Sequence, residues 1–221
     1  MGYESIDEVM KRGSVPLDPT EFEDVVERND ALILDTRPSE EYLKEHIPGS
    51  IWIGIDGNFA PWVGALIADL EQIIVFVATE GREQEIVTRL ARVGYDNAVG
   101  YLAGGIAAWK KAGCSTASLK SILAADFSDM ILKEYESILD VRKTNEFQSA
   151  HIAEAANFPL DYLNENIDLL DHTKTYYLYC QGGYRSVIAL SILRANGFNN
   201  IVNIAGGFEQ LKNNLYQPSR A

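Results

Sequence analysis

The segment from Cys180 to Ser186 holds the residues of this chain that are best suited to chemistry. It reads Cys-Gln-Gly-Gly-Tyr-Arg-Ser, follows an apolar, β-rich run over 176–179 and precedes a helical pattern of apolar residues. Glycines let successive backbone N–H groups turn toward one point, and a helix start adds its positive dipole end. A thiol held there ionises readily. The pattern predicts an anion-binding loop around a nucleophilic Cys180; the alternative is a buried structural cysteine beside an ordinary turn.

Composition limits the classes of partner and the number of domains. The 221 residues carry a formal net charge of −13, and 47% of them are hydrophobic. That length and apolar content favour two folded domains of about 110 residues. So acidic a chain is a poor partner for nucleic acid, because a phosphate backbone attracts basic surfaces. No membrane association is expected, because no apolar run is long enough to span a bilayer and the N-terminus lacks a signal-peptide pattern. Two cysteines, Cys114 and Cys180, make no disulfide framework, which indicates free thiols in a reducing cytoplasm.

The chain contains the same sequence plan twice. An apolar run ends in Asp-x-Arg at Asp35 and again at Asp140, and a histidine follows each aspartate 11 residues later (46 − 35 and 151 − 140). The later landmarks are related by an offset of 102: Ala78 with Cys180, Gly81 with Gly183, and Gly104-Gly105 with Gly206-Gly207. The earlier offset is 105, so the first copy has three extra residues, which we place near 57–62.

Within each copy, short β-rich runs alternate with helical patterns, which predicts a mostly parallel sheet covered by helices. In the second copy we predict strands near 137–140, 156–159, 175–179 and 201–204, and helices near 126–134, 144–149, 161–170, 186–196 and 207–213. The small, polar stretch 112–118 is typical of a linker. We therefore expect one domain over 1–113 and a second over 114–221.

These landmarks resemble the rhodanese family. The Asp-x-Arg strand ends, the His-Ile segments, the Cys-x-x-Gly-x-Arg-Ser loop and the late Gly-Gly pairs follow the family's order over nearly the whole chain. The resemblance implies an α/β fold of two tandem rhodanese-like domains, each with helices on both faces of its sheet. It also implies a sulfurtransferase that moves sulfane sulfur from thiosulfate or a persulfide to a thiol or cyanide. No cofactor and no metal are expected for this chemistry.

The resemblance implies that Cys180 is the catalytic nucleophile and becomes a persulfide. The residues expected to bind substrate are the rest of the loop: Gln181, Gly182, Gly183, Tyr184, Arg185 and Ser186. Gln181 and Tyr184 either shape substrate access or are merely exposed. Arg185 either adds positive charge at the sulfur or is held away from it by a carboxylate.

Three residues outside the loop are expected to support it. Glu146 is the candidate carboxylate for Arg185, with a solvated helix-face charge as the alternative. Asp140 and Arg142 are expected to stabilise the strand end through an ion pair rather than to take part in the reaction. His151 is expected to pack or to form hydrogen bonds, because an ionised thiol needs no general base.

The first domain is expected to be inactive. Ala78 stands where the second copy has cysteine, Glu83 replaces the arginine, and Glu80 adds a further negative charge. The segments 58–67 and 91–97 are similar to the C-terminal rhodanese part of bacterial proteins that fuse a metallo-β-lactamase fold to rhodanese domains. A metallo-β-lactamase-fold domain or protein is therefore a candidate partner, beside small sulfur donors and thiol acceptors. Because the chain lacks the metal motif of those proteins, it is either a fragment of one or a stand-alone relative.

Two other functions compete with sulfur transfer. The first is a sulfur-carrier or protein-interaction module of a larger persulfide-metabolising system. The second, a phosphatase or arsenate reductase, is weaker, because those relatives by fold use a loop one residue longer than the six residues from Cys180 to Arg185. Cys114 is either a resolving thiol or, as we prefer, an incidental linker cysteine.

Overall fold

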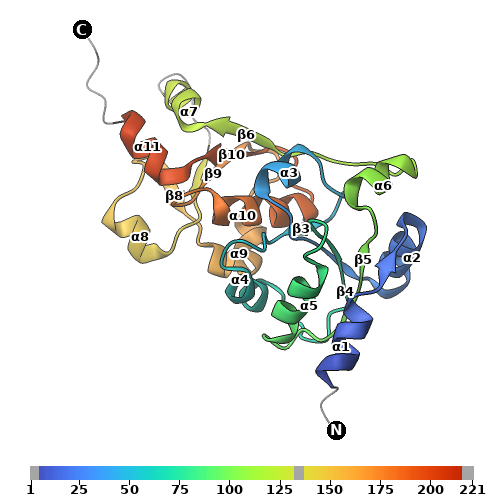
Figure 1. The fold of residues 1–221 in the computed structure, drawn as a ribbon. Coiled ribbons are helices and arrows are strands. Elements are labelled where there is room, and N and C mark those ends of the chain that lie inside the picture. The colour runs from blue at the N-terminus through green and yellow to red at the C-terminus, as the bar shows by residue number, and fades with distance from the viewer. Residues whose placement is uncertain (1–4, 132–136, 216–221) are drawn as a thin grey trace. The chain divides into compact units, whose positions relative to one another are not determined.

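The computed structural model describes residues 5–131 and 137–215. It divides the chain into two compact units, Met1–Ser118 and Leu119–Ala221, each drawn with its own sheet in Figure 1. Every strand pair within the two sheets is parallel. Both sheets have five strands in the same spatial order, β1-β5-β4-β2-β3 and β6-β10-β9-β7-β8. The predicted α/β class and the predicted repeat are confirmed.

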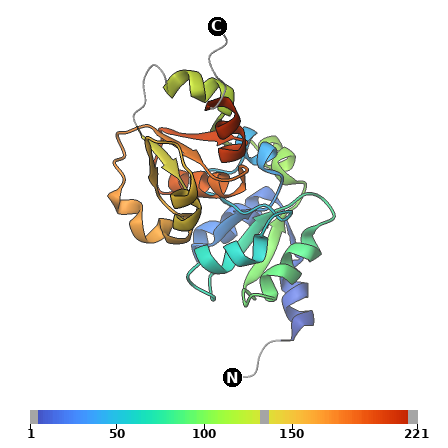
Figure 2. The same cartoon turned by 90° about the vertical axis from the view of Figure 1, so that its left-hand side faces the viewer.

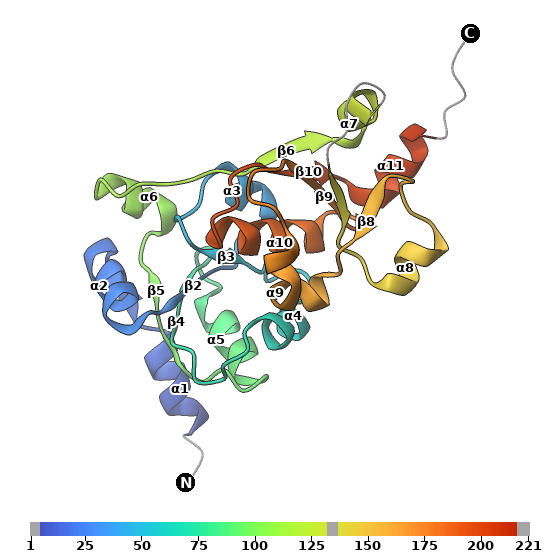
Figure 3. The same cartoon turned by 180° about the vertical axis from the view of Figure 1, so that it is seen from behind.

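The first unit alternates strands and helices after one additional N-terminal helix. Its elements are α1 (Ile6–Gly13), β1 (Pro16–Leu17), α2 (Pro19–Asn29), β2 (Leu32–Asp35), α3 (Ser39–Lys44), β3 (Ile51–Trp52), α4 (Phe59–Leu66), β4 (Ile74–Val77), α5 (Glu83–Ala91), β5 (Ala98–Leu102) and α6 (Gly105–Lys111). α1 packs against both α5 and β5, and Figure 3 shows the three side by side. The stretch 57–62, where three extra residues are predicted, covers the bend before α4 and the first residues of that helix.

The second unit repeats this order without the additional helix. Its elements are β6 (Lys120–Leu123), α7 (Ala124–Ile131), β7 (Ile138–Asp140), α8 (Thr144–Ser149), β8 (Ala155–Asn157), the 3₁₀ turn η1 (Leu160–Tyr162), α9 (Leu163–Asn166), the 3₁₀ turn η2 (Ile167–Leu169), β9 (Tyr176–Tyr179), α10 (Tyr184–Ala195), β10 (Ile201–Ala205) and α11 (Gly207–Leu215). The four predicted strands all form, and residues 132–134 of the helix predicted near 126–134 lie outside the described residues.

Two elements of the second unit differ from the prediction. The helix predicted over 161–170 is instead two 3₁₀ turns flanking the four-residue helix α9. Leu160 and Leu163 are buried at a helical spacing, but the intervening and following Asp and Asn residues favour turns over a continuous helix. The edge strand β6 had no counterpart in the prediction, because it is short and mostly exposed.

Helices cover both faces of the second sheet. Tyr177 and Tyr179 on β9 pack in a cluster with Phe127 of α7 and Leu211 of α11. Because side chains alternate along a strand, the fully buried Leu178 points to the opposite face, where α10 packs against β9 and β10. α7 and α11 lie side by side in Figures 1 and 2. None of the helices in the described residues is long and apolar enough to cross a membrane.

The glycine pair Gly206-Gly207 at the start of α11 lets this helix begin in contact with the Cys180 loop. The N–H of Phe208 donates to the Cys180 carbonyl at 2.7 Å, and the N–H of Glu209 donates to the Gln181 carbonyl at 3.2 Å. Gly207 has φ +57°, and a Cβ atom there would overlap the Cys180 carbonyl oxygen. The helix start therefore supports the loop through its otherwise unpaired N–H groups.

Gly207→Ala should lower the free energy of unfolding of the second unit. The left-handed backbone alone costs about 1–2 kcal/mol for an alanine, and the overlap with the loop adds to this cost. Gly105→Ala is the matched control, because Gly105 has the same φ of +57° but open space around its Cβ position. Urea unfolding should show the larger loss for Gly207→Ala; equal losses would mean that the loop contact contributes nothing.

Candidate active site

Cys180 lies where β9 ends, in the short loop that leads into α10. Its side chain is buried, with 1% of the residue exposed. The loop opens at the carboxyl end of β9, between β7 and β10 in the sheet, which is where ligands bind in parallel α/β sheets. The N-terminus of the 12-residue helix α10 follows directly and contributes its dipole and the N–H groups of its first turn.

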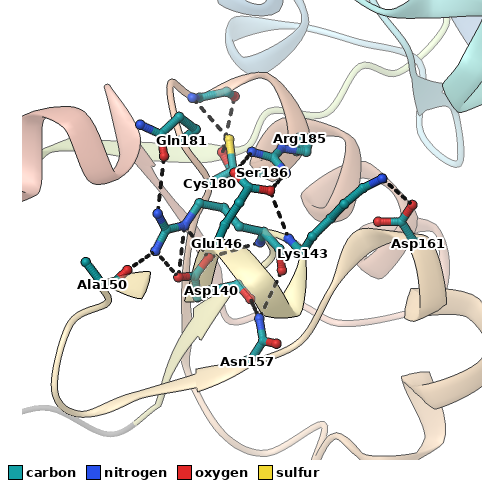
Figure 4. Close-up of polar contacts among 12 residues, drawn as sticks. Asp140, Lys143, Glu146, Ala150, Asn157, Asp161, Cys180, Gln181, Arg185 and Ser186 are labelled. Atoms are coloured by element: carbon teal, nitrogen blue, oxygen red, sulfur yellow. Dashed lines mark hydrogen bonds and ion pairs between the residues drawn. The ribbon is translucent and has the colours of Figure 1, made fainter. Parts of the chain in front are cut away.

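Two groups of the loop contact the sulfur. The Gly183 N–H donates to Sγ at 3.1 Å. The Ser186 hydroxyl oxygen lies 3.6 Å from Sγ, and Figure 4 draws the two residues together. Gly183 has φ +107°, a conformation that glycine adopts at little cost and that turns its N–H inward. The structure thus brings Cys180, Gly183 and Ser186 together; their part in binding substrate stays a prediction. Gly182 is exposed at the loop's outer edge, and Tyr184 is half-buried.

Arg185 is held by a carboxylate, which decides between the two alternatives for its role. Its guanidinium forms two hydrogen bonds with Glu146, at 2.6 and 2.8 Å, as Figure 4 shows. These bonds lower the pKa of Glu146 and, from the other side, raise the pKa of Arg185. Glu146 is therefore a partner of the loop and not a solvated charge. The pair fixes the first turn of α10 to the start of α8.

Asp140 and Arg142 form a buried ion pair at the end of β7, as predicted. Two guanidinium nitrogens of Arg142 donate to the Asp140 carboxylate, one of them at 2.6 Å, and Arg142 also donates to the Ala150 carbonyl at 2.7 Å. Asp35 and Arg37 repeat these contacts in the first unit, where the backbone acceptor is Glu45. The first unit keeps this ion pair although it has alanine at the cysteine position. The pair therefore stabilises the end of the strand and does not depend on the sulfur.

Gln181 is bound on both sides of its amide. Its Oε1 accepts from Arg142 at 3.2 Å, and its Nε2 donates to Glu209 at 3.2 Å. The Arg142 guanidinium also lies over the Phe208 ring, 4.0 Å from the centroid. Gln181 thus links the strand end to α11, a role that the sequence did not indicate.

The remaining predicted residues lie apart from the sulfur contacts. His151 stacks on Phe147 and shares a hydrogen bond with its carbonyl at 2.8 Å, which confirms its packing role. Cys114 is a free thiol that packs against the core of the first unit. Among the described residues, no group of three His, Cys, Asp or Glu side chains could hold a metal ion.

Asn203 is a polar residue of the site that the sequence reasoning missed. It lies on β10 with 3% of its surface exposed, and its Oδ1 accepts from the Ser186 hydroxyl at 2.8 Å. Its Nδ2 donates to the hydroxyl of Ser121 on β6 at 2.9 Å. A single asparagine inside the apolar run Ile201-Val202-Asn203-Ile204 could have drawn attention to it, because a buried amide needs partners.

In the corresponding loop of the first unit, a carboxylate of the loop accepts a hydrogen bond from a backbone N–H of the same loop. The Gly81 N–H, equivalent to that of Gly183, donates to the carboxylate of Glu83 at 3.1 Å. A carboxylate therefore takes the donor that the second unit offers to sulfur. A pocket of about 470 Å³ remains beside this loop, lined in part by Ala78, Glu80 and Glu83.

Comparison with known proteins identifies the family. The model of the rhodanese-like domain matches residues 18–112 and again 123–214. The chain belongs to the rhodanese-like domain family. YqhL of Bacillus subtilis is 42% identical over 73 residues, 33% of this chain and 58% of YqhL. The putative sulfur carrier protein YrkF of the same organism is 31% identical over 71 residues, 32% of this chain and 38% of YrkF.

A third rhodanese relative is the adenylyltransferase and sulfurtransferase MOCS3 of rice, Oryza sativa subsp. japonica. It is 35% identical over 85 residues, which cover 33% of this chain and 19% of the rice protein. The aligned part thus spans less than two thirds of each of these three relatives. The similarity is therefore limited to one domain-sized segment and does not extend over the whole length of these relatives.

The Glu146–Arg185 pair should make stability depend on pH in the acidic range. The pKa of Glu146 is lowered in the folded protein, so the pair stabilises fully above about pH 4.5, the ordinary pKa of a glutamate, and this contribution is lost as the pH falls through the lowered value. Glu146→Gln should flatten that loss in thermal melts recorded from pH 6 to about pH 3. The exposed Glu154→Gln is the control and should follow the unmodified protein; a Glu146→Gln profile that also overlays it would contradict the assignment.

Proposed function

We propose that the protein is a single-site sulfurtransferase in which the second unit carries sulfane sulfur as a persulfide on Cys180. The observation that supports this most directly is the short contact between Sγ and the Gly183 N–H at the start of α10. Membership of the rhodanese-like family and the sulfurtransferase and sulfur-carrier names of two relatives agree with it. Thiosulfate and persulfides are the proposed donors, and thiols and cyanide the proposed acceptors.

In the first half-reaction the Cys180 thiolate attacks the outer sulfur of the donor. A bond forms between Sγ and that sulfur, the S–S bond of the donor breaks, and the donor leaves with the electron pair as sulfite or a thiolate. In the second, the acceptor attacks the terminal sulfur of the enzyme persulfide. The Sγ–S bond breaks and returns its electron pair to Cys180. No external oxidant or reductant is needed.

The loop can stabilise negative charge in both half-reactions without a free cation. The guanidinium of Arg185 is engaged by Glu146 and that of Arg142 by Asp140, so hydrogen-bond donors carry the stabilisation. Backbone N–H groups and the helix dipole are fixed before the reaction and need no reorganisation. The same donors serve the thiolate and the longer persulfide anion, which is what a carrier of sulfur between two partners requires.

The first unit, in this proposal, has no sulfur chemistry of its own. Ala78 offers no nucleophile, and Glu83 blocks the equivalent N–H donor. The alternative function is a sulfur carrier that is loaded and unloaded by other proteins, which the name of YrkF favours. The partnership with a metallo-β-lactamase-fold domain and the cytoplasmic location stay predictions.

Loading of Cys180 is the direct test of the function. Treatment with thiosulfate or glutathione persulfide should add one sulfur atom to Cys180, and cyanide should remove it as thiocyanate, both visible by mass spectrometry. Cys180→Ala should abolish turnover, whereas Cys114→Ala should leave it nearly intact. Equal damage from Cys114→Ala would contradict a single site. Loading without turnover with any small acceptor would favour the carrier alternative.

A cysteine placed in the first unit should not restore activity. In a Cys180→Ala background, Ala78→Cys should give a thiol that alkylates slowly at neutral pH, because the Glu83 carboxylate occupies the Gly81 N–H and adds negative charge. Adding Glu83→Gln should increase the alkylation rate by removing that charge. Iodoacetamide labelling followed by peptide mass spectrometry measures both. Sulfur transfer by the Ala78→Cys variant alone would overturn this explanation of the inactive unit.

A further inference from the structure

A chain of three hydrogen-bonded polar side chains leads from β6 through the interior of the second unit to the sulfur. The exposed Ser121 accepts from Asn203, the buried Asn203 accepts from Ser186, and Ser186 lies against Cys180. Ser186 and Asn203 expose 0% and 3% of their surfaces. Burying a hydroxyl and an amide is costly unless each finds partners, so their presence beside the nucleophile calls for an explanation.

The Ser186 hydroxyl has one hydrogen and three neighbours that can accept it. These are Asn203 Oδ1 at 2.8 Å, the Gly183 carbonyl at 3.1 Å and the sulfur at 3.6 Å. When the sulfur is a thiol, its own hydrogen can point to the Ser186 oxygen, and the hydroxyl then donates to Asn203. When the sulfur is an anion it has no hydrogen, and the Ser186 hydroxyl can instead donate its own hydrogen to the sulfur and stabilise the charge. For the stabilisation of an anionic sulfur, the position of the Ser186 oxygen is therefore more important than which neighbour accepts its hydrogen while the sulfur is a thiol.

The first unit provides an internal comparison. The sequence offset of 102 relates Gln84 to Ser186 and Tyr101 to Asn203, and the strand register relates Pro16 to Ser121, because Pro16 pairs with Tyr101 as Ser121 pairs with Asn203. All three polar positions have changed in the unit that has Ala78 in place of the cysteine. By contrast, the Asp-Arg pair at the strand end is kept in both units. The three polar residues are thus present only in the unit that has the cysteine, whereas the fold is common to both units.

We propose that Asn203 is a positioning residue for the sulfur, acting through Ser186. Its amide, itself oriented by Ser121, keeps the Ser186 oxygen on the sulfur side of the α10 start, so that the hydroxyl can turn to the thiolate and to the persulfide anion. Without Asn203 the hydroxyl keeps its bond to the Gly183 carbonyl, as serines in the first turn of helices commonly do. The inference rests on the proposed function for the persulfide, but its thiolate part can be tested without sulfur transfer.

The test measures how the rate of Cys180 alkylation by iodoacetamide depends on pH in four versions of the full chain. These are the unmodified protein, Ser186→Ala, Asn203→Leu and the double variant. Asn203→Leu keeps the branching at Cγ and removes the amide. Each single variant should move the half-maximal pH upward by about one unit, the worth of one hydrogen bond to a charged group. The double variant should match Ser186→Ala, because Asn203 acts only through Ser186.

Ser191→Ala is the matched control, since Ser191 is a second buried serine of α10, hydrogen-bonded to the Ile188 carbonyl. Its alkylation profile should be unchanged even if its melting temperature falls. Asn203→Thr suits the strand and should shift the profile in the same direction if Asn203→Leu folds poorly. An unchanged profile in a folded Asn203 variant, or additive shifts in the double variant, would overturn the proposal. A Cys180 that alkylates as expected but accepts no sulfur would refute the proposed function alone.

Discussion

The proposed function needs a negatively charged sulfur at the buried end of a strand, and such a sulfur must find its hydrogen-bond donors within the protein. Cys180 is almost completely buried, so water cannot supply the donors. The Gly183 N–H supplies one because its backbone takes a positive φ, and α10 begins at the next residue. The loop in turn rests on the N–H groups of Phe208 and Glu209, which the glycine at 207 allows to come close.

The arrangement of charge around the loop follows from the same requirement. Two guanidinium groups, those of Arg142 and Arg185, belong to or contact the loop, and each is bound by a carboxylate with at least two hydrogen bonds. In the proposed reaction, a free guanidinium next to the sulfur would stabilise the persulfide strongly and slow the transfer to an acceptor. Fixed dipoles stabilise an anion more moderately and need no reorganisation when the charge moves from one sulfur atom to the next. The paired arginines thus brace the loop, and the proposal assigns the stabilisation of charge to the backbone.

Comparison of the two units separates the fold from the chemistry. Both keep the strand order, the buried Asp-Arg pair and the glycine pair before the last helix. The first unit differs at the loop itself: Ala78 stands at the position of Cys180, and the Glu83 carboxylate accepts from the Gly81 N–H. The N–H that the second unit turns toward the sulfur is thereby paired with a carboxylate of the same loop. Loss of the buried amide at the Asn203 position fits this pattern, because without an anion it would have only its cost.

The sequence by itself determined the repeated α/β architecture and the place of the Cys180 loop between a strand and a helix, and it predicted a nucleophilic Cys180 and an inactive first copy. These depend on local features: apolar runs of strand length, glycine where φ must be positive, and residue types at fixed offsets. Glu146 could be named only by resemblance, and the structure showed that it binds Arg185. The broken helix over 160–169, the edge strand β6 and the contacts of Gln181 and Asn203 were decided by tertiary structure. Side chains that meet across 17 to 39 residues leave no periodic trace in the sequence, because their partners are chosen by the packing of strands and helices that are distant along the chain.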